Sequence, residues 1–468
     1  MIGILIKKEL LVIFRNRSFL LTALIIQLLL FTAAAGGYRV FQESKAERLA
    51  AEKEKREQWL HQDPKHPHIA AHFGNFAYMP KTGLSLFDYG LDAFTGTVVY
   101  LEPHKQNEFS FKPAEEQNAS LRFGELSLAM ILQLLFPLLI IFNCFTAFSK
   151  ERSGGTIQLL YSQGVSFRQL YLGKFLACCI WILLLVLPAF ILLLLTQIWI
   201  KSAALELLRL LLLSTFYLFY LFLVAAVTLL VSAYSKNAKP AILTMIGIWL
   251  GFMVLVPKWS ASAGDNLYPL PSKYDFLQAI RRDIHQGIDG HNAKGTRAEQ
   301  LKTQLLQKYH VDTVSKLPFN FEGYVMQAGE AYSSRVYDKH FSKLQSRLQQ
   351  QNQIGLWCSL IDPFMAIKNI SMGLCGTDYG THLDFQRQAE NYRRFFVRSM
   401  NQDMEEHSKL GDWEYKVKKD TYAKIPAFHY VQRTIGQSLA PYLLGFCSLG
   451  LWLLVMVLLV EIYNKQSK

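Results

Sequence analysis

Three histidines in the segment PKHPHIAAH are the residues whose type and spacing most directly suggest chemistry. His68 and His72 are four residues apart, so on a helix they share one face, and His66 lies just before them. Imidazole nitrogens are good ligands for Zn²⁺ and Cu²⁺, and three of them can hold such an ion. The interpretation that we favour is simpler: these side chains form hydrogen bonds within an irregular surface region, and no metal site is expected. Metal analysis distinguishes the two.

Motifs of the common enzyme classes are missing from the sequence. There is no G-x-x-x-x-G-K-[ST] phosphate loop, no G-x-G-x-x-G after a strand, no H-E-x-x-H and no G-x-S-x-G elbow. We therefore expect that the chain is not an enzyme and has no catalytic residue and no cofactor of its own. Any uphill step must then take its energy from another chain.

The apolar residues are gathered in long runs rather than spread along the chain. Of the 468 residues 51% are hydrophobic, and six runs are long enough to cross a hydrocarbon core of about 30 Å as helices. Lipid offers no partner for backbone N–H and C=O groups, so each crossing should be helical, with kinks rather than breaks at Pro137 and Pro188. Glu206 and Arg209, near one span end, are expected to pair with each other.

These runs predict a membrane all-α fold with six transmembrane helices and an N-terminal interfacial helix. We expect a mixed α/β first extracytoplasmic region, with a strand in TGTVVYLEPHKQ, and a mainly helical second one. The expected segments are an interfacial helix at 1–17, spans at 18–37, 126–147, 172–196, 209–234, 239–256 and 437–461, a cytoplasmic loop at 148–171, and extracytoplasmic regions at 38–125 and 257–436.

Lysine and arginine residues near the span ends give the expected orientation. Basic residues precede the first span, occupy the loop after the second, and follow the fourth and sixth, which places both termini in the cytoplasm. Topology therefore explains much of the net charge of +13, and without a basic patch with interleaved aromatic residues we expect no nucleic-acid partner. The leader and Ala33-Ala34-Ala35 also fit a cleaved signal peptide, but the leader is long and amphipathic, so we expect the first span to be retained.

Six cysteines do not form a recognisable disulfide framework. Cys358 and Cys375 both fall in the second extracytoplasmic region, and whether they pair is left open. The others fall in spans, where thiols pack as small apolar groups: Cys144, Cys178, Cys179 and Cys447.

The loop FSKERSGGTIQLLYSQG (148–164) carries an apolar ridge outside the membrane. Its Ser-Gly-Gly sequence can reverse the chain, and a short helix can follow with Thr156 as its N-cap. Ser166 is placed to cap the helix that leads into the third span. The ridge has no obvious partner in so small a loop, so we expect it to insert into a groove on another protein. The ridge consists of Ile157, Leu160 and Tyr161.

The segment FSKERSGGTIQLLYSQGVSFRQLYLGKF resembles the signature loop of ABC-2 type permeases, the membrane subunits of ATP-binding-cassette exporters. The leader KKELLVIFRNRSFLL resembles the interfacial helix of that family. HPHIAAHFGNFAYMPKTGLSLFDYG and SMGLCGTDYGTHLDFQRQAENYRRFFVRSMNQDM resemble a bacterial subgroup with large extracytoplasmic domains after the first and fifth spans, although Cys375 departs from the small residue expected there. The loop positions that match the family are Glu151, Gly155, Thr156, Leu159, Leu160, Gly173 and Lys174.

The resemblance implies a permease subunit that couples ATP hydrolysis by separate ATPase subunits, which hold the ATP and Mg²⁺, to substrate export. It also implies the bacterial inner membrane, surrounding lipid and a second permease subunit, identical or related; a periplasmic or outer-membrane partner is left open. An alternative function is a mechanical transducer that moves the extracytoplasmic domains without transport through the spans. The cargo is not identified, although apolar spans favour a lipid-like, peptide or amphiphilic one. The residues expected to couple to the ATPase are Glu151, Gly155, Thr156, Ile157, Leu159, Leu160 and Tyr161.

Overall fold

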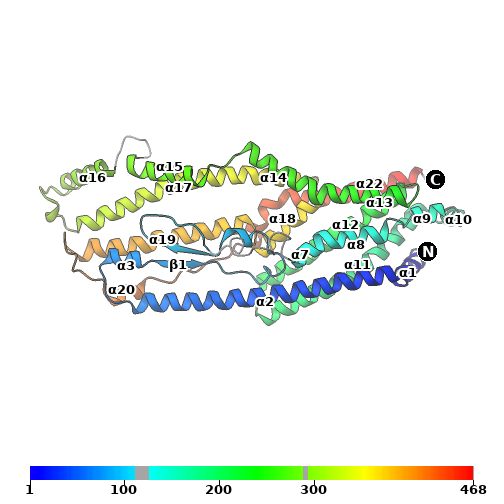
Figure 1. Ribbon diagram of the computed structural model, residues 1–468, viewed down its shortest axis with the longest axis horizontal. Helices are drawn as coiled ribbons and strands as arrows, with labels where there is room; N and C mark the ends of the chain where they lie inside the picture. Colours follow the sequence, from blue (N-terminus) through cyan, green and yellow to red (C-terminus); the bar gives the residue numbers. More distant parts are fainter. Residues whose placement is uncertain (111–125, 288–293, 467–468) are drawn as a thin grey trace.

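The computed structural model describes residues 1–110, 126–287 and 294–466 as one long, mainly helical molecule (Figure 1). It is 77% helix and 2% strand, which confirms the predicted membrane all-α fold. Both chain termini lie at one end, which we call the terminal end. Within these described residues, six helical segments are long and apolar enough to cross a membrane: Arg17–His61, Leu128–Ser153, Phe167–Trp199, Ala204–Tyr234, Ala238–Leu267 and Ile435–Gln466.

The first span is the beginning of a much longer helix. Helix α1 (Ile2–Phe14) lies at the terminal end, and α2 (Arg17–His61) runs from there along one edge of the molecule (Figure 1). At 1.5 Å per residue, the 45 residues of α2 extend about 68 Å, roughly twice the thickness of a hydrocarbon core. The helix therefore continues through the charged sequence after residue 37 into the part of the molecule farthest from the termini. We call that part, residues 38–110, 268–358 and 379–431, the distal region.

Helices continue past the prolines in the spans. In the second span, the π-helical turn η1 (Ile131–Leu135) follows α7 (Leu128–Met130), and Pro137 is in the first turn of the next helix, α8 (Phe136–Cys144). The wider turn accommodates a residue that lacks an N–H and crowds the turn before it. The fifth span repeats this order with α13 (Ala238–Leu250), η2 (Gly251–Leu255) and α14 (Val256–Leu267). Pro188 lies inside the continuous helix α11 (Phe167–Trp199).

Helix α12 (Ala204–Tyr234) contacts most of the bundle, including α8, α11 and α22 (Leu443–Gln466). The 3₁₀ turn η4 (Ala440–Tyr442) joins α22 to α21 (Ile435–Leu439). Helix α18 (Pro363–Cys375) also packs on α12 and α22, and its apolar side chains are buried in the same cluster as those of the spans. This segment is part of the expected extracytoplasmic region 257–436, and it packs directly against the ends of the spans.

In the distal region, residues from the two expected extracytoplasmic regions, 38–125 and 257–436, pack together as one unit. Strands β1 (Asn75–Tyr78) and β2 (Val98–Leu101) pair antiparallel, with Asn75 opposite Leu101, and β2 confirms the strand predicted in TGTVVYLEPHKQ. The indole of Trp59 on α2 is buried, and its Nε1 donates to the carbonyl oxygen of Tyr422 at 3.0 Å. The helices of this region are α3 (Pro67–Phe73), α4 (Asp92–Thr95), α15 (Lys273–Gln286), α16 (Lys294–Tyr309), η3 (Val314–Lys316), α17 (Phe321–Cys358), α19 (Tyr379–His407) and α20 (Lys419–Lys424).

The predicted pairing of Glu206 with Arg209 is wrong. The guanidinium of Arg209 instead donates to the carbonyl oxygen of Leu374 at 3.2 Å and to the hydroxyl of Ser438 at 3.3 Å, so it ties α12 to α18 and α21. Both carboxylate oxygens of Glu206 are buried without a hydrogen-bond partner among the described residues. The two side chains share a helix face, but tertiary contacts determine where the guanidinium binds.

The close packing of α17 on α19 gives a stability prediction. A Cβ at Gly323 would lie 2.7 Å from the backbone nitrogen of Glu405, whereas a Cβ at Gly329 on the same helix would meet nothing within 4 Å. We expect Gly323→Ala to destabilise the distal region by about 1–3 kcal/mol because backbone must move. Gly329→Ala should be neutral or stabilising by up to about 1 kcal/mol, since alanine favours a helix interior. Thermal unfolding in detergent compares the two variants; equal midpoints would contradict the predicted contact.

Candidate functional site

The loop between the second and third spans forms two short helices at the terminal end, α9 (Ser149–Ser153) and α10 (Thr156–Ser162) (Figure 1). Gly155 precedes α10 with φ +73°, a left-handed conformation that glycine adopts without strain. Gly155, rather than Thr156 as predicted, is therefore the N-cap residue. The predicted cap at Ser166 is confirmed, because its hydroxyl accepts from the backbone N–H of Gln169 in a capping box at the start of α11.

The apolar side chains of α10 divide between two directions. Ile157 is 4% exposed within the core of the bundle, and Leu160 and Tyr161 pack partly against that core. The ridge was expected to insert into a groove on another protein, and for Ile157 this expectation is wrong, because that side chain is buried in the chain's own bundle. Leu159 points the other way and is 58% exposed. The free apolar surface of this helix is thus centred on Leu159.

Glu151 connects the loop to two other segments through a buried lysine. The ammonium of Lys174 on α11 is 3.0 Å from Glu151 and 2.9 Å from Glu9 on α1, and the Lys174 side chain is 3% exposed. Lys8 adds a contact of 2.7 Å to the same oxygen of Glu151. Burial acts to raise the pKa of Glu9, but Lys174 and Lys8 hold it below its usual value. We call Lys8, Glu9, Glu151 and Lys174 the ionic cluster.

Helix α1 can approach this cluster because α11 has a glycine where the two helices touch. A Cβ at Gly173 would lie 2.7 Å from the Cβ of Leu5, which is buried in the contact. The adjacent Lys174 then reaches Glu9, four residues after Leu5 on α1. Gly173 and Lys174 thus act together: the first lets the helices meet, and the second supplies the charge that holds them.

Arg152 connects the same loop to the opposite side of the bundle. Its guanidinium donates to the hydroxyl of Tyr463 on α22 at 2.6 Å and to the backbone carbonyls of Ala233 and Ser235 at the end of α12. The hydroxyl of Ser232 also accepts from the backbone N–H of Phe148 at 3.0 Å. Two neighbouring side chains, Glu151 and Arg152, therefore link α9 and α10 to α1, α11, α12 and α22. A displacement of α10 would act on all four helices.

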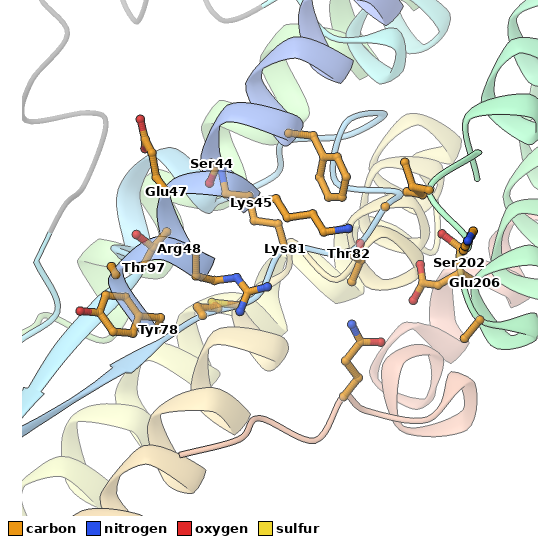
Figure 2. Close-up of a pocket in the computed structure, with 18 of the residues that line it drawn as sticks. Ser44, Lys45, Glu47, Arg48, Tyr78, Lys81, Thr82, Thr97, Ser202 and Glu206 are labelled. Carbon is orange, nitrogen blue, oxygen red and sulfur yellow. The ribbon is translucent and has the colours of Figure 1, made fainter. Parts of the chain in front are cut away.

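A second candidate site is a pocket of about 470 Å³ where the spans meet the distal region (Figure 2). Arg48 on α2 and Glu206 at the start of α12 lie on opposite sides of it. The basic side chains of Lys45, Lys81 and Lys201 also line it, together with apolar side chains such as Phe41 and Ile200. This lining can accept a ligand that carries an anionic group, a cationic group and an apolar part.

The structure separates the three histidines that the sequence grouped. His66 caps α3, and its ring stacks on Trp413 with centroids 4.6 Å apart. His68 and His72 do share a face of α3, but the third imidazole beside them is that of His104, from the loop after β2. His66 is therefore not part of a possible ligand set, and His104, 32 residues after His72, could not be recognised from local spacing. All six cysteines, including Cys358 and Cys375, are free.

The contacts of the ionic cluster were also not predicted from the sequence, although the position of Lys174 indicates that it needs carboxylate partners. Lys174 lies only three residues before the apolar run ACCIWILLLV, and a lysine in such a place must find carboxylates if it is buried. Glu9 is the single acidic residue of the leader. What could not be read from the sequence is that α1 folds back against α11.

Comparison with known protein families divides most of the chain into two parts. Residues 99–270, from β2 through the loop that follows α14, match the family model described as ABC-2 family transporter protein. Residues 273–431, from α15 to the segment after α20, match one described as Domain of unknown function (DUF3526). No protein of curated function matches the chain. The first match covers α9, α10, Glu151 and Lys174.

Replacement of Lys174 tests the ionic cluster. Lys174→Met keeps most of the side-chain volume but leaves two largely buried carboxylates with Lys8 alone, which should cost about 3 kcal/mol, the lower end of the range for breaking a buried ion pair. The unfolding midpoint in detergent should fall by several degrees. Lys239→Met, at an exposed lysine near the start of α13, is the matched control and should leave the midpoint unchanged. If both variants melt like the wild type, the cluster does not hold these segments together.

Proposed function

We propose, from the premise that residues 99–270 are an ABC-2 type permease domain, that this chain is the membrane subunit of a bacterial ATP-driven exporter. The ABC-2 family implies association with an ABC ATPase and dimerisation in general. In this exporter, ATP binding and hydrolysis in a separate ATPase subunit would move α10, and α10 would transmit this movement to the spans.

The exposed Leu159 on α10 is the observation that carries this proposal. Leu159 on α10 exposes 58% of its surface, while its neighbours Ile157 and Leu160 pack the other side of the same helix against the bundle. Burying such a side chain in a partner would contribute about 1.5–3 kcal/mol. A helix that is packed firmly on the bundle and exposes one apolar residue is suited to transmit a movement of a bound partner protein to the spans.

The charge distribution supports a cytoplasmic location for the terminal end. Lys7, Lys8, Arg15 and Arg17 lie at or before the start of α2, and Lys150 and Arg152 lie on α9 at the same end of the molecule. Basic residues concentrate on the cytoplasmic side of membrane proteins. In the proposed orientation, the distal region is then periplasmic and the protein is in the inner membrane.

Two of the spans have faces available for a second permease subunit. Only 11% of the most apolar window in Ala238–Leu267 and 22% of that in Ile435–Gln466 is buried within the chain, against 61% in Leu128–Ser153. Lipid can cover such faces, and so can the corresponding helices of a second copy. We propose a dimer of permeases with an ATPase subunit beneath each.

The pocket between the spans and the distal region (Figure 2) supports the proposal that the cargo is an amphiphile or a peptide rather than a free ion. It combines four basic side chains with the unpartnered carboxylate of Glu206, at the junction of the spans and the distal region. A molecule with a charged head and an apolar part could contact the pocket and the lipid together.

Substitution of Leu159 tests the ATPase contact. Leu159→Asp places a charge on the exposed face of α10 without disturbing the buried one, so the permease should fold normally but lose its ATPase. The tagged chain is purified from its native host in mild detergent, and the co-purifying subunits are identified by mass spectrometry. The wild type should retain a subunit with a G-x-x-x-x-G-K-[ST] loop and hydrolyse ATP, and the variant should lose at least nine tenths of both.

Leu410→Asp, at an exposed leucine in the distal region, is the matched control and should retain the ATPase. If Leu159→Asp retains it equally well, α10 is not the contact. If the wild-type chain hydrolyses ATP without any second subunit, the proposed division of labour is wrong.

A further inference from the structure

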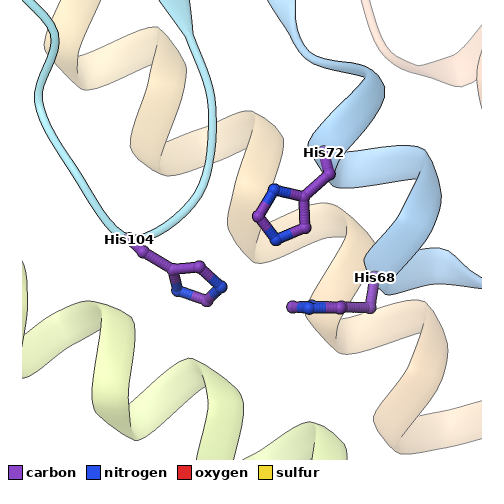
Figure 3. A group of neighbouring side chains, drawn as sticks. All are labelled: His68, His72 and His104. Carbon is purple, nitrogen blue, oxygen red and sulfur yellow. The ribbon is translucent and has the colours of Figure 1, made fainter.

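Three imidazole rings face one another in the distal region, far from the terminal end (Figure 3). His68 and His72 come from α3, and His104 comes from the loop after β2. The ring centroids are 4.7 Å apart for His68 and His72, 5.1 Å for His72 and His104, and 5.5 Å for His68 and His104. One ring nitrogen of each lies within 4.8 Å of those of the other two.

The ring of His104 is held in place by a buried carboxylate. Its Nδ1 is 2.5 Å from Oε1 of Glu330 on α17, and its backbone N–H donates to the same oxygen at 2.7 Å. Glu330 is 6% exposed, and His104 and Arg393 act against burial to hold its pKa below the usual value. The contact with Glu330 engages Nδ1 of His104, so Nε2 is the ring nitrogen that remains available to a ligand.

The backbone of His104 also has an uncommon conformation. Its φ of +70° is in the left-handed region, which residues other than glycine seldom occupy. A conformation of this kind persists only where the surrounding structure imposes it, and such positions cluster at functional sites. Here the contact with Glu330 fixes both the backbone and the ring, so that the imidazole is presented to the α3 pair.

We propose that His68, His72 and His104 bind one divalent transition-metal ion, Zn²⁺ or Cu²⁺, with Glu330 as the residue that orients His104. Three imidazoles with an open fourth position form a common ligand set for these ions. A carboxylate that accepts the second ring N–H of a ligand histidine is a recurrent feature of such sites. Two ligands four residues apart on a helix are also typical of zinc sites.

The rings need only small rotations to reach ligand geometry. Nitrogens bound to Zn²⁺ at about 2.0–2.1 Å in a tetrahedron are about 3.3 Å apart, so nitrogens separated by as much as 4.8 Å must move inward by about 1.5 Å. His72 is exposed and can turn, and the exposed rings of His72 and His104 leave an open path for the ion from solvent.

The hydrogen-bonding interpretation of these histidines accounts for His104 but not for the α3 pair. Among the described residues, neither ring of His68 or His72 has a hydrogen-bond partner. A bound ion would use both. It would also join α3 and the β2 loop directly, and, through Glu330 and its contact with Arg393 at 3.5 Å, α17 and α19. The ion would therefore stiffen the contact between the two sequence segments of the distal region.

Metal titration of the full-length chain tests this site. The protein is purified in detergent with a tag that lacks histidine, stripped with a chelator, and titrated separately with Zn²⁺ and Cu²⁺. We expect one tight equivalent per chain, with Kd on the order of micromolar or below, that both ions compete for and that raises the unfolding midpoint. Electron paramagnetic resonance of the Cu²⁺ form should show nitrogen ligands.

Substitutions test whether the bound metal ion is held by these residues. His72→Asn, at an exposed position, should abolish it or weaken it at least about tenfold without loss of fold, and Glu330→Gln should weaken it about 10–100-fold. His61→Asn, at an exposed histidine that ends α2, is the control and should bind as the wild type does. The proposal is overturned if the wild-type chain has no such equivalent, or if His72→Asn and His104→Asn bind both ions as tightly as the wild type.

Discussion

A buried ammonium ion requires carboxylate partners, and Lys174 meets this requirement by drawing three separate segments together. It projects from α11 between Glu9 of α1 and Glu151 of α9, at 2.9 and 3.0 Å. If α1 were elsewhere, or if the loop after the second span were turned, a charge would be left in an apolar environment. The same contact therefore fixes the leader on α11 and sets the direction in which α10 presents Leu159. Arg152 repeats the principle towards α12 and α22, with hydrogen bonds in place of ion pairs.

Buried polar groups also join the bundle to the distal region. The hydroxyl of Tyr217 on α12 accepts from Gln133 at 2.6 Å and donates to Ser371 on α18 at 2.9 Å, and Ser371 in turn donates to Asp88. Arg209 makes a second connection from α12 to α18 and α21. Each group is costly to bury alone, so the network is stable only when α18 and the loop around Asp88 are seated together. Together with the unbroken helix α2, these contacts give a continuous path from the terminal end to the distal region.

The candidate sites lie at the two ends of this path. At the terminal end, Glu151 and Arg152 of α9 connect the loop to four helices, and α10 exposes Leu159 as the proposed ATPase contact. Towards the other end, the charged pocket lies where the spans meet the distal region, and the three imidazoles lie within that region. An ion at His68, His72 and His104 would stiffen the distal region, because its ligands come from α3 and the loop after β2, and Glu330 comes from α17. The proposed exporter would thus receive energy at one end and handle its cargo near the other.

The sequence by itself determined the class of fold. Six apolar runs must be helices because lipid provides no hydrogen-bond partners, and the β-branched run Val98–Leu101 and the cap at Ser166 follow from equally local rules. The loop motif also indicated the permease family from residues close together in the chain. Only the tertiary structure decided which side chains meet. Ile157 turned inward, Arg209 bound α18 and α21 rather than Glu206, α18 joined the bundle, and His104 replaced His66 beside the α3 pair. Periodicity specifies which residues share a face of one helix, but the partner of that face comes from a distant part of the chain, and local spacing does not identify it.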